Sequence, residues 1–213
     1  MNPTDYLQAM RAESIPAASS GKWYISKLIL DIETFSMQHG KLVTVPAGHY
    51  TYLYRLTDST MQNEPPGEVV MEDTPFELKT HLGFILSAYG KVLITGLGLG
   101  CVIRGLQANP NVENIVCIEN SPNVLKMVAP YMPKEKLTIV EADALEWTGR
   151  NKDPFDCAWH DLWTDREAGE PHLDIWHAQL IRNCMKKVDR QGAWNMSRLG
   201  KKVLMDRGFP WMG

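Results

Sequence analysis

The segment "KVLITGLGLGCVIRGL", from Lys91 to Leu106, constrains the fold more than any other part of the chain. Five mostly apolar, partly β-branched residues run into Gly96, Gly98 and Gly100, and an amphipathic helical pattern follows. A buried strand, a glycine turn and a helix in this order are typical of the first unit of a parallel sheet that binds a nucleotide-like ligand. The loop therefore raises the question of which ligand would contact its backbone.

Apolar strands alternate with helical segments on both sides of this loop. We expect strands over 91–95, 113–119, 136–143, 154–161 and 190–196, and helices over 73–90, 100–110, 121–132 and 171–188. Short apolar strands separated by helices predict an α/β fold, a doubly wound and mainly parallel Rossmann-like sheet covered on both faces. The segment after "QGAWNM" is too short for a further helix and an antiparallel hairpin, so the sheet is expected to stop after its fifth strand. One edge is then left open or covered by a partner.

The first third of the chain has a different pattern. Residues 1–22 predict a short helix or a loose tail, whereas 23–73 is rich in β-branched and aromatic residues, punctuated by turns at Gly40, 46–48 and 63–67. We interpret this region as a small antiparallel β unit that lies over the carboxyl face of the main sheet. The expected domains are therefore 1–73, the β-rich N-terminal unit, and 74–213, the Rossmann-like domain.

Composition and charge narrow the class of protein. With 44% hydrophobic and 22% charged residues, the chain is typical of a globular protein. A net charge of -3 does not indicate nucleic-acid or membrane binding. The four cysteines lie far apart and form no metal-ligand pattern, so we expect no metal and buried free thiols. The N-terminus does not resemble a secretory signal, and the longest apolar run is too short to span a bilayer, which favours a cytoplasmic protein.

The glycine loop departs from the phosphate-binding patterns. In the dinucleotide fingerprint G-x-G-x-x-G the third glycine would fall at position 101, which is Cys101. No Lys followed by Ser or Thr closes the run, and the loop contains no basic residue, so a phosphate would meet only backbone N–H groups. These departures weaken the phosphate interpretation, and with it a dinucleotide oxidoreductase, without eliminating it.

Acidic residues follow the next two predicted strands. Glu119 is placed to accept hydrogen bonds from ribose hydroxyls, and Asp143 or its neighbouring backbone to accept one from an adenine amino group. Together with the loop they outline an adenosine that carries an uncharged substitute for phosphate, such as the methionyl part of S-adenosylmethionine. The alternatives are a strand-end charge for Glu119, a helix cap for Asp143 and a simple turn for the loop. The expected cofactor contacts are Gly96, Leu97, Gly98, Leu99, Gly100, Glu119, Asn120, Asp143 and Ala144.

The fourth strand ends in "FDCAWHDLWTD", which offers catalytic candidates. Asp161 can stabilise a sulfonium cation, orient an amine or accept its proton, and a loop-bracing carboxylate is the alternative. His160 is a weaker candidate, since a hydrogen bond within the scaffold also explains it. We expect Asp73, His81 and Trp163 in an acceptor pocket. Further tryptophans either line that pocket or belong to the core or an interface, namely Trp159, Trp176, Trp194 and Trp211.

These motifs resemble those of class I S-adenosylmethionine-dependent methyltransferases, in the order "VLITGLGLG", "IEN", "EADA" and "FDCAWHDLW". More narrowly, "MEDTPFELKTH", "WHDLW" and "RQGAW" are similar to small methyltransferase-like proteins of phages and bacteria. The resemblance covers about 68–196 and implies S-adenosyl-L-methionine as the cofactor, bound at Gly96, Gly98, Gly100, Glu119 and Asp143. No "NPPY"-type segment follows the fourth strand, so amino methylation of DNA bases in that style is not indicated.

A second resemblance is to spermidine synthases, which transfer an aminopropyl group from decarboxylated S-adenosylmethionine to an amine. It rests on the β-rich N-terminal piece, the acidic segment at Glu72 and Asp73, and Asp161, which in that family would assist amine deprotonation. The family's doubled glycine and the acidic run after the loop are missing from "GLGLGCVIRG".

The expected function is methyl transfer to a small-molecule or otherwise unidentified acceptor. The alternatives are an aminopropyltransferase and a non-catalytic adenosyl-cofactor-binding or assembly protein. The sequence leaves a homodimer open.

Overall fold

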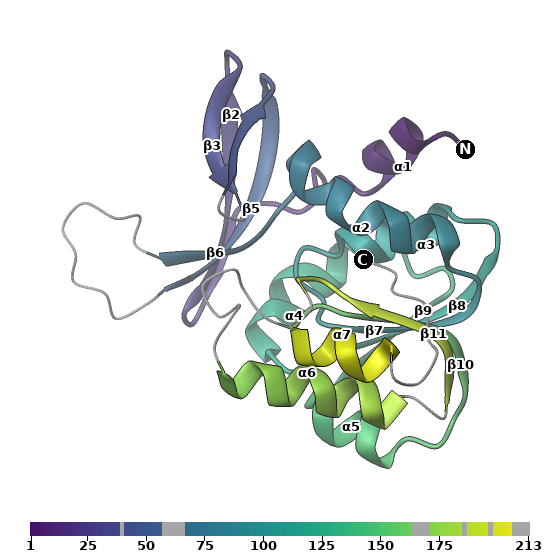
Figure 1. Ribbon diagram of the computed structural model, residues 1–213. Coiled ribbons are helices and arrows are strands. Elements are labelled where there is room, and N and C mark those ends of the chain that lie inside the picture. Colours follow the sequence, from purple (N-terminus) through teal and green to yellow (C-terminus); the bar gives the residue numbers. More distant parts are fainter. Residues whose placement is uncertain (39–40, 57–66, 163–170, 185–186, 196–197, 206–213) are drawn as a thin grey trace.

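The computed structural model describes residues 1–38, 41–56, 67–162, 171–184, 187–195 and 198–205 (Figure 1). Within these ranges the chain forms a five-stranded parallel sheet, a four-stranded antiparallel sheet and a two-stranded hairpin. The predicted α/β architecture with a small antiparallel β unit is therefore confirmed.

The parallel sheet has the order β11-β10-β7-β8-β9. Its strands are β7 (Gly90–Thr95), β8 (Val112–Glu119), β9 (Leu137–Glu141), β10 (Phe155–His160) and β11 (Val188–Ala193). The direction of strand progression reverses between β7 and β10, so the carboxyl ends of these two strands form the topological switch point at which doubly wound sheets bind ligands.

Helices cover both faces of this sheet. They are α2 (Pro75–Ser87), α3 (Cys101–Ala108), α4 (Pro122–Val128) with the 3-10 turn η1 (Ala129–Tyr131), α5 (Ala144–Arg150), α6 (Pro171–Cys184) and α7 (Arg198–Met205). In Figure 1, α2 and α3 lie on one side of the sheet and α5, α6 and α7 on the other. Both faces of the strands are therefore buried, which explains their nearly continuous apolar sequences.

The described part of the N-terminal region contains α1 (Pro3–Ala9) and six strands. These are β1 (Ala18–Ser20), β2 (Trp23–Leu30), β3 (Thr34–Gln38), β4 (Lys41–Val45), β5 (Gly48–Leu56) and β6 (Gly67–Glu72). Strands β1, β2, β5 and β6 form the antiparallel sheet, and β3 pairs with β4. The division into domains at residues 73 and 74 stays a prediction.

Two segments differ from the sequence-based expectation. The segment after "QGAWNM" was expected to be too short for a further helix, and this prediction is wrong, because 198–205 is helical and packs against α6. The helix expected over 171–188 ends at Cys184, because Val188 already belongs to β11. The described part of the parallel sheet has five strands, as predicted.

The core lies between the parallel sheet and its helices. Trp159 on β10 is 1% exposed and stacks on Phe84 of α2, with ring centroids 4.9 Å apart. All four cysteines are buried free thiols, as expected. Among the helices in the described ranges, none has the length and apolar character needed to cross a membrane.

Candidate functional site

A pocket of about 440 Å³ lies where β7, β8, β9 and β10 end. Its volume falls within the range of about 300–1,000 Å³ typical of small-molecule sites. The predicted residues that line it are Gly96, Gly98, Glu119, Asn120, Asp143, Ala144 and Asp161. The acids at three successive strand ends and the glycine loop therefore meet in one cavity.

The three glycines of the loop have backbone conformations that disfavour other residues. Their φ angles are +95° at Gly96, +50° at Gly98 and +73° at Gly100. A Cβ at these positions would overlap the carbonyl oxygen of Asp161, the sulfur of Met71 and the sulfur of Met132, respectively. The positive φ angles thus favour glycine at all three positions, and at Gly96 a close contact with the backbone of Asp161 adds to this.

Most amide groups of the loop already donate hydrogen bonds inside the protein. The bonds run from Gly96 N to Ile118 O (2.8 Å), Leu97 N to Glu119 Oε2 (2.8 Å), Leu99 N to Met71 Sδ (3.1 Å) and Gly100 N to Leu97 O (2.8 Å). A phosphate bound in the usual way would need these donors. The geometry therefore favours a ligand without phosphate at this loop. Three expected cofactor contacts, Leu97, Leu99 and Gly100, are buried and do not line the pocket.

Glu119 forms the end of β8 and is 8% exposed. Its Oε2 accepts from Leu97 N and its Oε1 from Ser121 N, each at 2.8 Å. Burial is the main influence on the pKa of Glu119 and raises it, whereas these backbone donors and the amide of Asn120 act in the opposite direction. A carboxylate has about four acceptor positions. Glu119 can therefore fix the loop and still accept hydrogen bonds from a ligand hydroxyl.

Asp143 caps a helix, which was the alternative to a cofactor contact, and it also lines the pocket. It is the N-cap of α5, with Oδ1 accepting from Glu146 N at 2.9 Å, and it is exposed on the pocket wall. One carboxylate oxygen thus caps the helix while the side chain remains part of the cavity.

Asp161 follows β10 at the switch point. Its amide donates to Thr95 O at 2.9 Å, which extends the pairing of β10 with β7 by one residue. Its carbonyl oxygen lies against Gly96, and Asp161 lines the pocket beside the glycine loop. The structure therefore brings this catalytic candidate to the expected place.

His160, the other catalytic candidate, lies inside the sheet and does not line the pocket. Its Nδ1 is 3.1 Å from Thr95 Oγ1, and its Nε2 is 3.3 Å from Gln191 Oε1. Because the Gln191 carbonyl only accepts, Nε2 carries the proton and Nδ1 accepts from the Thr95 hydroxyl. Burial lowers the pKa of His160 to about 4, so the ring is neutral and links β7, β10 and β11.

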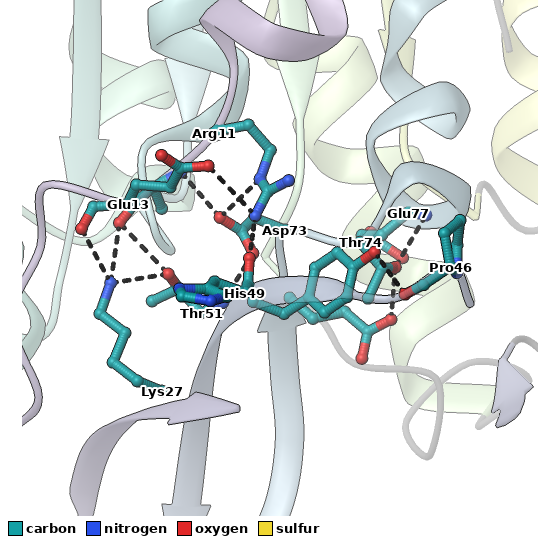
Figure 2. Close-up of polar contacts among 12 residues, drawn as sticks. Arg11, Glu13, Lys27, Pro46, His49, Thr51, Asp73, Thr74 and Glu77 are labelled. Atoms are coloured by element: carbon teal, nitrogen blue, oxygen red, sulfur yellow. Dashed lines mark hydrogen bonds and ion pairs between the residues drawn. The ribbon is translucent and has the colours of Figure 1, made fainter. Parts of the chain in front are cut away.

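Asp73 was expected in the acceptor pocket but lies in a separate buried cluster (Figure 2). Its Oδ2 accepts from Arg11 Nε at 3.1 Å and Ala12 N at 2.9 Å, and its Oδ1 from Thr51 N at 2.6 Å. The N-cap of α2 is the next residue, Thr74. Asp73 therefore joins the N-terminal segment to β5 and the start of α2.

Of the other two acceptor-pocket candidates, His81 lies away from the pocket and Trp163 cannot be placed. His81 is fully buried on α2, with Nε2 3.3 Å from Glu77 Oε1, and does not line the cavity. Trp163 lies outside the described residues, as does Trp211. Trp159 belongs to the core, whereas Trp176 and Trp194 line the pocket.

Several lining residues were not singled out from the sequence. They are Trp23, Leu53, Arg55, Val70 and Met71 from the antiparallel sheet and Glu77 from α2. The sequence predicted only that a β-rich unit lies over the carboxyl ends of the strands of the parallel sheet. In the structure, residues of that unit form part of the pocket wall. Which of its side chains face inward depends on how the two sheets dock.

No protein-family model matches the sequence. Among solved structures, the chain is similar to spermidine synthase from Thermotoga maritima, with 15% identity over 81% of this chain and 70% of that one and a TM-score of 0.45. It is also similar to a spermidine synthase in complex with the transition state analogue AdoDATO, with 15% identity over 82% of this chain and 70% of that one and a TM-score of 0.46. A third similar structure is human methyltransferase-like protein 13 in complex with SAH, with 16% identity over 60% of this chain and 68% of that one and a TM-score of 0.41. These similarities are weak. The narrower resemblance through "WHDLW" and "QGAW" stays a prediction.

Proposed function

We propose that the protein is a class I S-adenosylmethionine-dependent methyltransferase. The observation that carries this proposal is the convergence of Gly96, Gly98, Glu119, Asp143 and Asp161 on a single pocket at the switch point of the sheet. Each of these residues ends or follows a different strand or belongs to the first loop, so their meeting depends on the topology and not on proximity in sequence.

The residues present fit an adenosyl ligand. Glu119 retains an acceptor position for a ribose hydroxyl, Asp143 lies at the next strand end for the adenine amino group, and the loop has few amides left for phosphate. Arg55 on β5 adds a guanidinium to the wall, which suits the carboxylate of a methionyl group.

The cofactor supplies an activated methyl group and a good leaving group, so few catalytic side chains are needed. The protein's part is to exclude water and hold the acceptor in line. Asp161 lies beside the loop, where a carboxylate can orient the acceptor or take its proton.

The first test is isothermal titration calorimetry with S-adenosylmethionine, S-adenosylhomocysteine, decarboxylated S-adenosylmethionine and NAD. The variant is Glu119→Gln, and the matched control is Glu113→Gln, an exposed acid near the other end of β8. We expect the two carboxylated adenosyl ligands to bind, with affinity about tenfold lower in Glu119→Gln because a charged acceptor is lost. Glu113→Gln should bind as the wild type does. Binding of NAD alone, or of no adenosyl ligand, would contradict the proposal.

A second candidate function is aminopropyl transfer, favoured by the position of Asp161 in the pocket wall beside Gly96. It predicts preference for the decarboxylated cofactor in the same titration. A non-catalytic binding protein would bind the cofactor but turn over no acceptor.

A further inference from the structure

One part of the pocket wall has no role in the proposed function. The proposed cofactor contacts that line the cavity belong to the glycine loop, the end of β8 and the segments that follow β8 and β9. In the sheet order, β10 and β11 lie on the other side of β7. Apart from the catalytic candidate Asp161, the described residues that line the cavity from that side are Leu162 after β10, Trp176 and Leu180 of α6, and Trp194 after β11. We call these four residues the apolar wall.

Part of the apolar wall is open to solvent. Trp176 and Leu180 lie on the same face of α6, because residues four positions apart on a helix are neighbours. Leu180 is 1% exposed, whereas Trp176 is 50% exposed and Leu162 is 41% exposed. The two exposed side chains also line the cavity, so they lie where it opens to solvent. Exposed apolar side chains grouped at a cavity are typical of a ligand-binding site.

Trp194 is the fixed part of the apolar wall. It follows β11, and its amide donates to His160 O at 2.9 Å, which extends the pairing of β10 with β11 beyond the last residue of the strand. Trp194 is only 8% exposed. Because strand pairing holds the backbone and the surrounding protein covers most of the side chain, a ligand does not have to order this ring on binding.

The chemistry of the apolar wall favours a flat ring. Indole rings hold planar aromatic molecules by offset stacking or edge-to-face contact, in addition to the burial of apolar area. Leu162 and Leu180 add aliphatic contacts of the kind that line most small-molecule sites. An ammonium group placed against these four side chains would lose hydration that they cannot replace.

The charges elsewhere in the cavity disfavour an anion. The acids among the described lining residues are Glu77, Glu119, Asp143 and Asp161. The lining guanidinium is that of Arg55, whose Nη2 is 2.9 Å from Glu68 Oε2 and whose Cζ is 5.9 Å from the ring centroid of Trp23. Negative charge is therefore in excess around the cavity, which repels a carboxylate or phosphate carried by an acceptor.

We propose that the acceptor of this site is an uncharged, planar aromatic molecule and that the rings of Trp176 and Trp194 hold it. This inference rests on the proposed transferase function and names the class of its acceptor. The aromatic molecule replaces water at the exposed surface of Trp176, and the nearly buried Trp194 fixes its position. An adenosyl ligand and an aromatic ring at the apolar wall occupy different parts of the cavity, so both bind at the same time.

The test is a ligand-observed NMR titration of the full chain with phenol, cyclohexanol, benzoate and n-butylamine, each with and without saturating S-adenosylhomocysteine. Phenol and cyclohexanol have the same ring size and the same hydroxyl group, but only phenol is planar and aromatic. We expect phenol to bind about two- to tenfold more tightly than cyclohexanol, because aromatic contacts add to area burial. Benzoate should bind more weakly than phenol, and phenol should still bind when S-adenosylhomocysteine is present.

The tryptophans are tested by the ratio of the phenol affinity to the cyclohexanol affinity. This ratio should fall toward one in Trp176→Leu, which keeps an apolar side chain without a ring, and should be retained in Trp176→Phe. Trp194→Leu and Trp194→Phe form a second pair with the same expectation. The matched control is Ile175→Ala, which removes an exposed apolar side chain of α6 that does not line the cavity. General damage to the fold would not separate the Leu variant from the Phe variant at equal thermal stability.

Several outcomes would overturn this inference, and two of them need no variant to fold. These two are equal wild-type affinities for phenol and cyclohexanol, and tighter binding of n-butylamine than of phenol. Displacement of phenol by S-adenosylhomocysteine would also overturn it, because phenol would then lie in the cofactor part of the cavity. An unchanged ratio in both Trp176→Leu and Trp194→Leu would remove the two rings from the site.

The same titrations separate this inference from the proposed function. If S-adenosylhomocysteine binds and phenol does not, the aromatic site fails and the proposed function stands. If phenol binds in a manner that depends on Trp176 but no adenosyl ligand binds, the aromatic site stands and the transferase proposal fails.

Discussion

Replacing Asp73 by Asn is expected to destabilise the protein without removing its cofactor site. The carboxylate lies at the centre of a buried cluster and accepts from Arg11 Nε, Ala12 N and Thr51 N (Figure 2). Arg11 also contacts the carbonyl of His49 and lies over the Tyr50 ring at 5.0 Å. Asp73 thus holds together three segments that are distant in sequence.

The magnitude follows from what an amide can replace. Asn has the same shape but only one acceptor oxygen, so its NH₂ group must face either Thr51 N or the donors of Arg11 and Ala12. At least one buried backbone N–H then loses its partner, which costs about 1–3 kcal/mol. The contact with Arg11 also loses its charge, which reduces a hydrogen bond of about 1.5–3 kcal/mol toward a neutral value. We expect the free energy of unfolding to fall by about 2–4 kcal/mol in total.

The assay is urea unfolding followed by tryptophan fluorescence, with Asp31→Asn, an exposed Asp between β2 and β3, as the control. Affinity for S-adenosylhomocysteine, measured well below the unfolding midpoint, should change by less than about twofold, since Asp73 does not line the pocket. A loss of stability below about 1 kcal/mol, or a selective loss of ligand binding, would refute a structural role for Asp73.

Two further predictions test other parts of the structure. Burial lowers the pKa of His160 from its ordinary value of 6.5 to about 4 in the folded protein. Between these two pH values the unfolded chain binds a proton that the folded chain does not, so the free energy of unfolding falls as the pH drops from 6.5 toward 4. The loss of unfolding free energy between pH 7 and pH 5 should therefore be about 2 kcal/mol larger in the wild type than in His160→Gln, and equal losses would contradict this assignment. Gly98→Ala adds a Cβ 2.5 Å from Met71 Sδ at a φ of +50°, so it should lower the thermal midpoint. In a Met71→Ala background that contact is absent, so Gly98→Ala should cost only the backbone strain of about 1–2 kcal/mol. A double-mutant cycle measured by urea unfolding should therefore give a loss of stability smaller than the sum of the two single losses. Additive losses would count against the contact.

The sequence predicted the parallel sheet well because its signals are local. Apolar runs of strand length, the N-cap Thr74 with Pro75 at the start of α2, and the glycines after β7 all act within a few residues. The acids at the strand ends met in one pocket because the topology of a doubly wound sheet brings carboxyl ends together. The helix at 198–205 was not predicted, because the expectation for this segment rested on its length and not on its helical pattern.

The rest of the site depends on contacts that no local pattern encodes. Asp73 precedes a helix, which suggests a cap or an entrance to the pocket, but its partner Arg11 lies 62 residues earlier. Glu77 and His81 show the spacing of neighbours on a helix, yet that spacing does not reveal that one faces the cavity and the other the core. The position of the Asp73 side chain and the orientations of Glu77 and His81 were both decided by how the antiparallel sheet docks onto the parallel one.

The glycine loop shows why spacing alone could not identify a ligand. Each glycine is explained by its positive φ angle, so the G-x-G-x-G pattern by itself requires no cofactor. The hydrogen bonds add what the sequence lacked, because amides that bind Glu119 and Met71 are not available to phosphate. Glu119 connects these observations, since the same carboxylate that fixes the loop also forms part of the pocket wall. A ligand hydroxyl that binds Glu119 would therefore act on a loop already held in place, which is the preorganisation that tight binding of a nucleoside needs.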